Sequence, residues 1–575
     1  MRTALRAVPP WTWATLGIVA WVVLNAVWWV AHRQGQSLNI DEAGYLASAL
    51  NDSQSASRAG VTGWMRTVLW PSSFGPLVPA VTSVLVLAGV ELTAAGAAVS
   101  LAFAGATLAG TWCVGRRVLP TRAAWLPVLL LATAPGFVAL SRMFGFGVPG
   151  AALTTWALYA LVRSRSHEAL RWSLALGVLV GLMPMTRTML VAFVPVVLGA
   201  GLLQSVVAPG RRVRRLVHWA CSATTAVVVA GIWLLHSWRP VFDYLVGFGY
   251  GSHSTAYRND AGGAGASRPV LVLRMLLQEW YLSHTVLILG GLLAGLVALV
   301  VGVRTARVRL TVRAAVASPA FVLLAVLVGG VAVLMSSQNG GSGFTLALLP
   351  AAAILAVKGW RTAGDVVRAA SWARAGAVVA AAATCVVIFL GWYLGSGPLS
   401  VPRNVDLGTL GWAHVTDGQQ FYAAGNFPPD RSLVTSEELA DDWSRATDEV
   451  AARTLRADGS PRPAALGFRG VLLNVNTVAL TLAQRLGYPN AMSQVDPVTA
   501  TDVAGYHAWL TDGTAKDACV LLTSSGEVDE YAPYVDTPAL ETAARDLGFV
   551  RTGTVAVPDG RTVDVWERGT PSCAH

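Results

Sequence analysis

Acidic residues are scarce in the first 400 residues of this 575-residue chain, although the whole chain contains 32 of them. The first 400 residues contain only Asp41, Glu42, Asp52, Glu91, Glu168, Asp243, Asp260, Glu279 and Asp365. Any chemistry there that needs a carboxylate must use one of these. The same part is rich in Lys and Arg, which are dispersed among apolar segments. That dispersion excludes a nucleic-acid-binding surface and is typical of cytoplasmic loops.

Charge of both signs is also rare. Charged residues make up 13% of the chain, hydrophobic residues make up 54%, and the mean hydropathy is +0.53. These values exclude a soluble multidomain protein and predict a polytopic α-helical membrane protein. The acids return after about residue 400, which indicates a soluble part at the C-terminal end.

Cysteine is rare as well, with five in the chain. Only Cys519 and Cys573 lie in the soluble part, and they permit one disulfide if that part is outside the cell. The N-terminal apolar run has a basic start and lacks a small-residue cleavage site. It is therefore interpreted as a retained helix whose N-terminus is cytoplasmic.

Eleven apolar runs are long enough to span a membrane, and a twelfth, "FGPLVPAVTSVLVLAGV" at 74–90, is ambiguous. The Arg-rich loops between the apolar runs lie at 116–122, 163–171, 211–215, 304–313 and 358–374. If 74–90 also spanned, these loops would all face outward, against the positive-inside rule. We therefore expect an interfacial helix there. The eleven runs are 11–31, 93–113, 121–140, 147–163, 170–186, 188–207, 217–238, 283–303, 314–336, 344–359 and 374–395.

This threading predicts a transmembrane domain at 1–398, with long outer loops at 32–92 and 239–282, and an extracytoplasmic α/β domain at 399–575. In the latter, "AALGFRGVLLNV" and "DACVLLTS" are typical of strands, and "TVALTLAQRLG" and "PALETAARDLG" of helices. A hairpin is expected to turn at Asp559-Gly560. No metal, phosphate-loop or nucleophile motif occurs in this part, so it is assigned either acceptor binding or a structural role.

The stretch "SLNIDEAGYLASAL" (37–50) places two of the rare acids just after the first apolar run. Asn39 and Glu42 have the spacing of a capping box, which gives Glu42 a purely structural interpretation. The negative charge of Asp41 could likewise only stabilise the positive end of the dipole of the helix that follows. The residues of this stretch alone leave catalytic and structural roles open.

Several motifs in order resemble the GT-C class of membrane glycosyltransferases. They are "DEAGYLASAL", "WPSSFGPLVPAV", "SRMFGFGVPGAALTTWALYAL" and "GLMPMTRTML". The nearest resemblance is to the protein O-mannosyltransferase and aminoarabinose transferase group (glycosyltransferase family 39 and relatives), over roughly 10–360. In two places the chain departs from that pattern: Gly147 stands where relatives usually have Asp, and Gly343-Phe344 where they have Arg-Tyr.

The resemblance implies a glycosyltransferase of the cell membrane and envelope that uses a polyprenyl-phosphate sugar and acts on a protein, lipid or wall glycan. Direct displacement at the anomeric carbon implies inversion. The resemblance also implies that Asp41 is the base that takes the proton from the acceptor hydroxyl, with Glu42 orienting the site. Arg142 and Arg187 are the candidates for binding the donor phosphate, against an alternative in which each contacts lipid headgroups. Further candidates are Tyr45, Arg239, His253 and Arg258.

No cofactor is implied with certainty, and a dependence on a divalent metal is left open. Two other classes of function also remain. A transporter or flippase for a lipid-linked glycan would carry ionisable groups deep inside its helices, and this chain has almost none at that depth. A non-catalytic membrane scaffold would leave "DEAGY" without a role.

Overall fold

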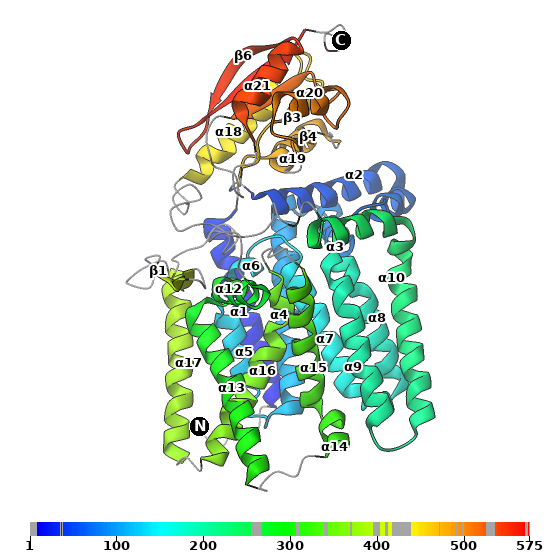
Figure 1. Cartoon of the computed structure of the whole chain (residues 1–575), viewed down its shortest axis with the longest axis vertical. Helices are drawn as coiled ribbons and strands as arrows, with labels where there is room; N and C mark the ends of the chain where they lie inside the picture. Colours follow the sequence, from blue (N-terminus) through cyan, green and yellow to red (C-terminus); the bar gives the residue numbers. More distant parts are fainter. Residues whose placement is uncertain are drawn as a thin grey trace.

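The computed structural model describes residues 9–34, 36, 38–251, 254, 267–305, 311–337, 343–367, 371–394, 403–408, 412–416, 439–470, 472–488, 492–496, 499–524, 535–569 and 573. A helical body occupies the lower part of Figure 1, and an α/β part lies above it. This arrangement confirms the fold class predicted from the sequence.

Among the described residues, seven helical stretches are long and apolar enough to cross a membrane. They comprise α1 (Pro10–His32), α4 (Leu92–Val118), η2 (Thr188–Phe193) with α9 (Val194–Val207), α10 (Arg212–Gly249), α13 (Tyr281–Arg304), α15 (Pro319–Ser336) and α17 (Ser371–Leu394). Shorter helices run beside these (Figure 1): α5 (Trp125–Thr133), α7 (Gly147–Ser164), α8 (Leu170–Thr186) and α16 (Leu349–Val366). The expected spans therefore all contain helix, and α10 continues well beyond its expected end.

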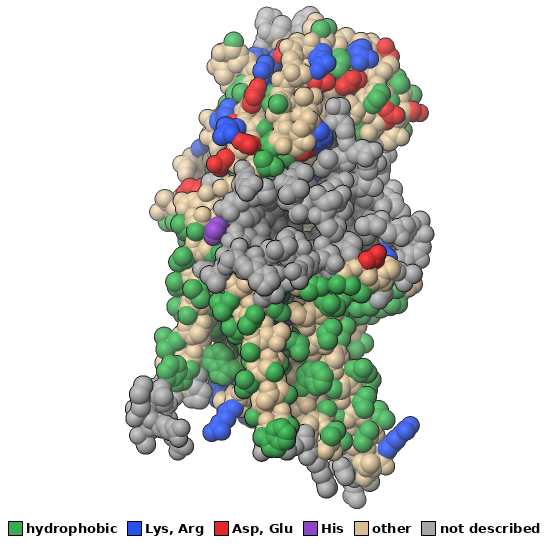
Figure 2. Space-filling view, turned by 90° about the vertical axis from the view of Figure 1, so that its left-hand side faces the viewer, with side chains coloured by type: hydrophobic (Ala, Val, Ile, Leu, Met, Phe, Trp, Pro, Cys, Tyr) green, Lys and Arg blue, Asp and Glu red, His purple; other side chains and the backbone are tan. Residues whose placement is uncertain are grey.

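The outer surface of the helical body is apolar, as contact with lipid requires. Large side chains such as Val19, Leu235 and Leu293 are exposed on it. Figure 2 shows hydrophobic side chains over this lower part, whereas charged side chains gather on the α/β part.

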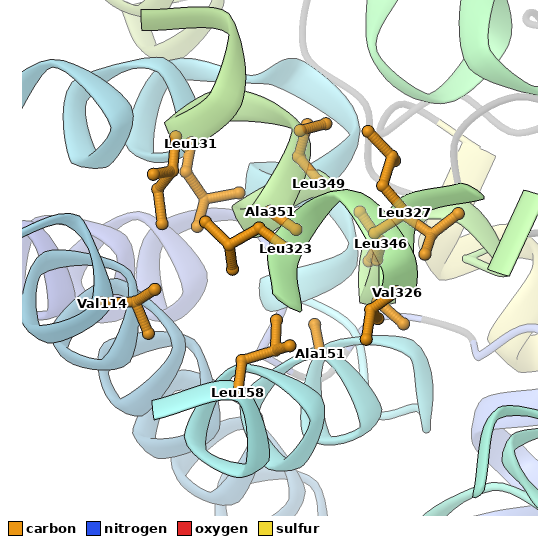
Figure 3. Close-up of a cluster of buried hydrophobic side chains, with 14 of the residues drawn as sticks. Val114, Leu131, Ala151, Leu158, Leu323, Val326, Leu327, Leu346, Leu349 and Ala351 are labelled. Atoms are coloured by element: carbon orange, nitrogen blue, oxygen red, sulfur yellow. The ribbon is translucent and has the colours of Figure 1, made fainter. Parts of the chain in front are cut away.

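The interior of the helical body is a continuous apolar core (Figure 3). Side chains of α4, α5, α7, α15 and α16 meet there, among them Leu131, Leu158, Leu323 and Leu349. Helices α13 and α16 approach so closely that a Cβ on Gly359 would lie 2.0 Å from the carbonyl oxygen of Gly291. Only glycine permits this contact, which is a frequent way of packing membrane helices.

Helices α2 (Ile40–Val68) and α12 (Arg268–Glu279) lie across the top of the helical body, and α3 (Leu77–Leu87) packs against α2 (Figure 1). α2 starts with the predicted capping box, because Asn39 accepts from the backbone of Glu42 and Glu42 reaches back to Asn39. It bends at Ala59 and Gly60, where Gly60 has a φ of +63°. The described part of this body also contains the short helices α6 (Pro135–Ser141), α14 (Val312–Ala317) and η3 (Thr345–Ala347).

The α/β part contains one five-stranded sheet in the order β4-β3-β5-β7-β6. β4, β3 and β5 are parallel, and β7 is antiparallel to both β5 and β6. Its strands are β3 (Ala464–Leu466), β4 (Ser493–Gln494), β5 (Val520–Ser524), β6 (Phe549–Ala556) and β7 (Thr562–Arg568). A separate pair, β1 (Arg403–Asp406) and β2 (Trp412–Thr416), follows α17.

Helices cover both faces of the five-stranded sheet. α18 (Ala440–Arg453) and α19 (Val475–Leu486) pack on the face that carries Leu466 and Leu522. α20 (Val503–Thr511) and α21 (Thr537–Asp546) pack on the face that carries Leu521 and Trp566. The strands thus alternate between two cores, as the two-residue period of a strand requires.

Three sequence predictions in this part need comment. The hairpin at Asp559-Gly560 is confirmed, and so is the bond that the sequence permitted between Cys519 and Cys573. The strand predicted over "AALGFRGVLLNV" was too long, because β3 ends at Leu466 and a loop follows it. In the transmembrane domain, the long outer loop predicted at 239–282 is helical at both ends, in α10 and α12.

Candidate functional site

Glu42 connects three segments of the chain at the top of the helical body. Its carboxylate accepts two hydrogen bonds from Arg33, at 2.7 and 2.9 Å, and one from the backbone N–H of Phe144 at 3.0 Å. Both members of the Arg33–Glu42 ion pair are buried. Removing one partner of a buried pair leaves the other charge uncompensated, which costs roughly 3–5 kcal/mol. Glu42 therefore holds the first turn of α2 against α1 and the segment after α6.

Asp41, the adjacent residue, has a different environment, because its side chain is exposed to solvent. Protein nevertheless surrounds it closely enough that burial raises the pKa of its carboxyl above the usual range. The positive charges of Arg469 and Arg187 oppose this rise in pKa, and the negative charge of Glu42 adds to it. Asp41 is thus open to water, with two cations near its carboxylate.

Arg187 is the single residue between α8 and η2, as the predicted turn requires. Its backbone is extended, with φ −148° and ψ 121°. The turn is fixed from outside, because the Thr188 hydroxyl donates to the carbonyl of Ser73 and Gly75 lies against the carbonyl of Met185. The guanidinium lies 4.1 Å over the ring of Phe344. The "WPSSFGP" segment thus positions Arg187 at the site.

Behind Arg187 lies a narrow apolar pocket between η2, α7, α15 and η3. Gly147, Leu190, Leu334 and Phe344 are among its lining residues. Gly147 and Gly343, where the sequence departs from the family pattern, thus lie beside Arg187. A Cβ on Gly343 would come within 3.1 Å of the Arg187 guanidinium.

Tyr45 stands one helical turn after Asp41 and belongs to an aromatic group. Its ring stacks on Phe146 at 3.7 Å and meets the edge of Phe74 at 5.8 Å. Phe74 in turn lies 6.3 Å from Tyr244. Burial raises the pKa of the Tyr45 hydroxyl well above its usual range, and the charge of Asp41 raises it further. The hydroxyl therefore stays protonated and can donate a hydrogen bond.

Arg469 was not predicted, since the stretch around it was interpreted as a strand. It lies in the loop that joins β3 to α19. That loop is fixed to the start of α2, because the Asn476 side chain donates to the Ile40 carbonyl at 2.9 Å. Asn476 also packs against Gly44, where a Cβ would come within 2.8 Å of its amide nitrogen. The α/β part thereby brings a positive charge to Asp41.

Glu279 is another residue near Arg187 that the sequence did not single out as a site candidate. It ends α12, is buried, and accepts hydrogen bonds from the backbone N–H of Gly343 at 2.6 Å and from Thr345. Burial raises the pKa of its carboxyl, and these hydrogen bonds and the charge of Arg187 oppose the rise. Glu279 holds the segment that carries Phe344, and so supports Arg187 indirectly.

The other sequence candidates lie elsewhere. Arg142 is 1% exposed, so it does not reach out to lipid headgroups. It donates to Asn25 at 2.8 Å and stacks over Trp28 at 3.7 Å, between α1 and α6. Arg239 is exposed on α10, over the ring of Trp238. His253 and Arg258 lie outside the described residues.

Metal ligation was left open by the sequence. Within the described residues, no three His, Cys, Asp or Glu side chains converge in a way that could hold a metal ion. The positive charge that the described part brings to Asp41 comes from arginines.

Comparison with known proteins gives one family match and several similar folds. Residues 75–235 match the family model described as dolichyl-phosphate-mannose-protein mannosyltransferase. No curated protein sequence matches the chain. Among solved structures, ArnT from Cupriavidus metallidurans bound to undecaprenyl phosphate aligns with a TM-score of 0.53 and 17% identity, over 96% of this chain and 98% of that one. Its apo state aligns with a TM-score of 0.55, at the same identity and over the same shares of both chains.

A third solved structure comes from an archaeon. The oligosaccharyltransferase AglB from Archaeoglobus fulgidus, in complex with an inhibitory peptide and a dolichol-phosphate, aligns with a TM-score of 0.52 and 12% identity, over 96% of this chain and 74% of that one. The fold is that of the GT-C class of membrane glycosyltransferases. Within the class, the family match confirms the predicted resemblance to the mannosyltransferase group. The similarity of fold also extends beyond the motifs, into the α/β part.

Proposed function

We propose that this protein is an inverting glycosyltransferase that moves a hexose or pentose from a polyprenyl-phosphate donor to an acceptor hydroxyl beside Asp41. The observation that carries the proposal is a solvent-exposed carboxylate, Asp41, with the positive charges of Arg187 and Arg469 close to it. The solved relatives support the choice of donor, since ArnT was captured with undecaprenyl phosphate and AglB with a dolichol-phosphate.

The chemistry follows from these residues. The acceptor oxygen attacks the anomeric carbon while Asp41 takes the hydroxyl proton, which a carboxylate with a raised pKa holds better. The bond from the anomeric carbon to the phosphate oxygen breaks, and its electron pair stays on the phosphate. The phosphate therefore gains one negative charge as the sugar departs. Arg187 and Arg469 stabilise that charge. Because the negative charge on the phosphate is larger in the transition state than in the bound donor, this interaction lowers the barrier to transfer.

The apolar pocket beside Arg187 suits the same donor. It offers the first units of a polyprenyl chain an apolar surface next to the cation that would bind the phosphate. Arg is apt for this role because its planar fork can hold two phosphate oxygens and stays charged.

We further propose that the Asp41 side of the protein is extracytoplasmic, with the N-terminus in the cytoplasm, residues 1–398 forming the membrane domain and 399–575 the outer domain. The ends of α4, α7 and α13 that carry Arg116, Arg163 and Arg304 lie away from α2 and the α/β part (Figure 1). The disulfide between Cys519 and Cys573 supports this orientation, because disulfides persist in oxidising compartments.

The decisive experiment is a transfer assay with purified full-length protein. Asp41→Asn keeps the shape of the side chain and removes its basicity, so we expect turnover to fall by roughly 10² or more. Asp365→Asn is the control, since Asp365 is an exposed acid paired with Arg374. Consumption of a polyprenyl-phosphate sugar also separates transfer from transport and from a scaffold role. Near-normal transfer by folded Asp41→Asn protein would refute the assignment of the base.

A further inference from the structure

A hollow separate from the pocket beside Arg187 lies where the helical body meets the α/β part. It has a volume of about 400 Å³ and is enclosed by the α1–α2 connection, the start of α4, and helices α18 and α19. Asp41, Arg187 and Arg469 do not line it. A volume of this size is within the range of small-molecule sites.

The lining of this interface hollow is mostly polar, and Glu91 is the one charged residue among its described lining residues. Hydroxyl groups come from Thr93, Ser444 and Thr481 among others, and amides from Gln34, Gln36 and Gln484. Hydroxyls and amides both donate and accept hydrogen bonds, which matches a neutral ligand rich in hydroxyl groups. The described lining includes no Lys or Arg, so a phosphate group would find no counter-charge there.

Two further features of the hollow favour a sugar. Leu38, Leu472 and Leu480 supply apolar patches against which the C–H faces of sugar rings can pack. The amide oxygen of Gln36 is buried and has no hydrogen-bond partner among the described residues. An unpaired buried acceptor costs roughly 1–3 kcal/mol, which a donor hydroxyl would recover.

The interface hollow is close to the site of transfer. Leu38 lines it and Asp41 follows three residues later, so their Cα atoms are at most about 11 Å apart. α19 contributes Thr481 to the hollow and, through Asn476, also holds the carbonyl of Ile40. Asp41 and the hollow are thus separated by no more than the length of a few sugar units.

We propose that the interface hollow binds a neutral oligosaccharide portion of the acceptor. This proposal rests on the proposed function, since it takes Asp41 as the site of transfer. The acceptor is then a glycan of several units, held between the membrane body and the α/β part. The alternative is a crevice that holds only water.

The test is direct binding of a neutral mannose disaccharide and hexasaccharide to full-length protein in nanodiscs, measured by calorimetry without donor. Ser444→Trp fills the hollow, and Arg445→Trp places the same side chain on the neighbouring exposed position of α18. We expect Ser444→Trp to weaken hexasaccharide binding about tenfold or more, which corresponds to the loss of one or two hydrogen bonds. Arg445→Trp should bind like the parent.

Thr481→Val removes one lining hydroxyl with little change of shape, and should also weaken the hexasaccharide if Ser444→Trp fails to fold. Equal hexasaccharide affinity in the parent and Thr481→Val, or no binding by the parent, would overturn the proposal. Because no sugar is transferred in this measurement, its failure is distinct from a failure of the Asp41 assay.

Discussion

Arg187 shows how this fold fixes a side chain by restricting its backbone. Helices end and begin on either side of it, and contacts with Ser73 and Gly75 hold the turn. Little freedom of position is left to the guanidinium, which rests on Phe344. A cation held in this way needs no reorganisation when charge develops on a nearby phosphate.

Replacing Arg187 therefore tests whether it binds the donor phosphate. We expect Arg187→Ala to lower kcat by roughly 10²–10³, as when one oxyanion donor is removed, and Arg187→Lys to keep part of the activity as a point charge. Steady-state rates with saturating donor measure this effect. Arg66→Ala, an exposed arginine of α2, is the matched control. Parent-like rates for Arg187→Ala at equal protein levels would remove Arg187 from the site.

For single residues, the sequence predicted the local structure correctly where near neighbours in the chain determine it. The capping box of Asn39 and Glu42 follows from a spacing of three residues, and the Arg187 turn from two adjacent apolar runs. Arg469 and Glu279 could not be predicted in this way. Their partners are hundreds and tens of residues away, and only tertiary packing brings them together.

At the scale of elements, the length of α3 bears on the proposed topology. Its 11 residues give a length of about 16 Å, which is too short for a hydrocarbon core of about 30 Å. It packs instead against α2 and the start of α4. The sequence favoured the same interpretation for a different reason: an additional span at 74–90 would have placed the Arg-rich loops outside the cell.

The position of α3 can be tested in intact cells by thiol labelling. In a variant without the three membrane cysteines, Val90→Cys should react with an impermeant reagent, because Val90 follows α3 and is exposed. Arg116→Cys, at the other end of α4, should be protected until the membrane is permeabilised. Labelling at Arg116→Cys together with protection at Val90→Cys would mean that the proposed orientation is inverted.

The stretch "AALGFRGVLLNV" shows why some elements were wrongly predicted. Its apolar character is real, since Leu466, Leu472 and Leu473 are all buried. Only Ala464–Leu466 pairs with neighbouring strands, and the later leucines pack from a loop. Apolar runs of this length do not reveal whether burial comes from a sheet or from a loop.

At the scale of the whole molecule, the α/β part contributes a charge to the proposed site. The positive charge of Arg469 lowers the pKa of Asp41, against the effect of burial. A base must be deprotonated to act, so activity falls as the pH drops through that pKa. Removing the charge raises the pKa, and the acid limb of the rate profile should then move to higher pH.

We therefore expect Arg469→Gln to lower kcat/KM at least about tenfold and to shift the acid limb upward, whereas Arg485→Gln should change neither. Arg485 is an exposed residue of the neighbouring α19, paired with Asp448. The pH dependence of kcat/KM provides the readout. A lower plateau with an unmoved limb would mean that Arg469 acts only on the packing of the two parts.

The attachment of Arg469 to the end of the chain also has a consequence for biosynthesis. Asp41 is translated early, and Arg469 only after α17, the last long helix described in the helical body. In the proposed orientation, the residues after about 400 must be exported and folded before Arg469 reaches Asp41. The disulfide between Cys519 and Cys573 forms in that part of the chain. Under the proposed function, newly made protein should therefore begin transfer only after the α/β part has folded.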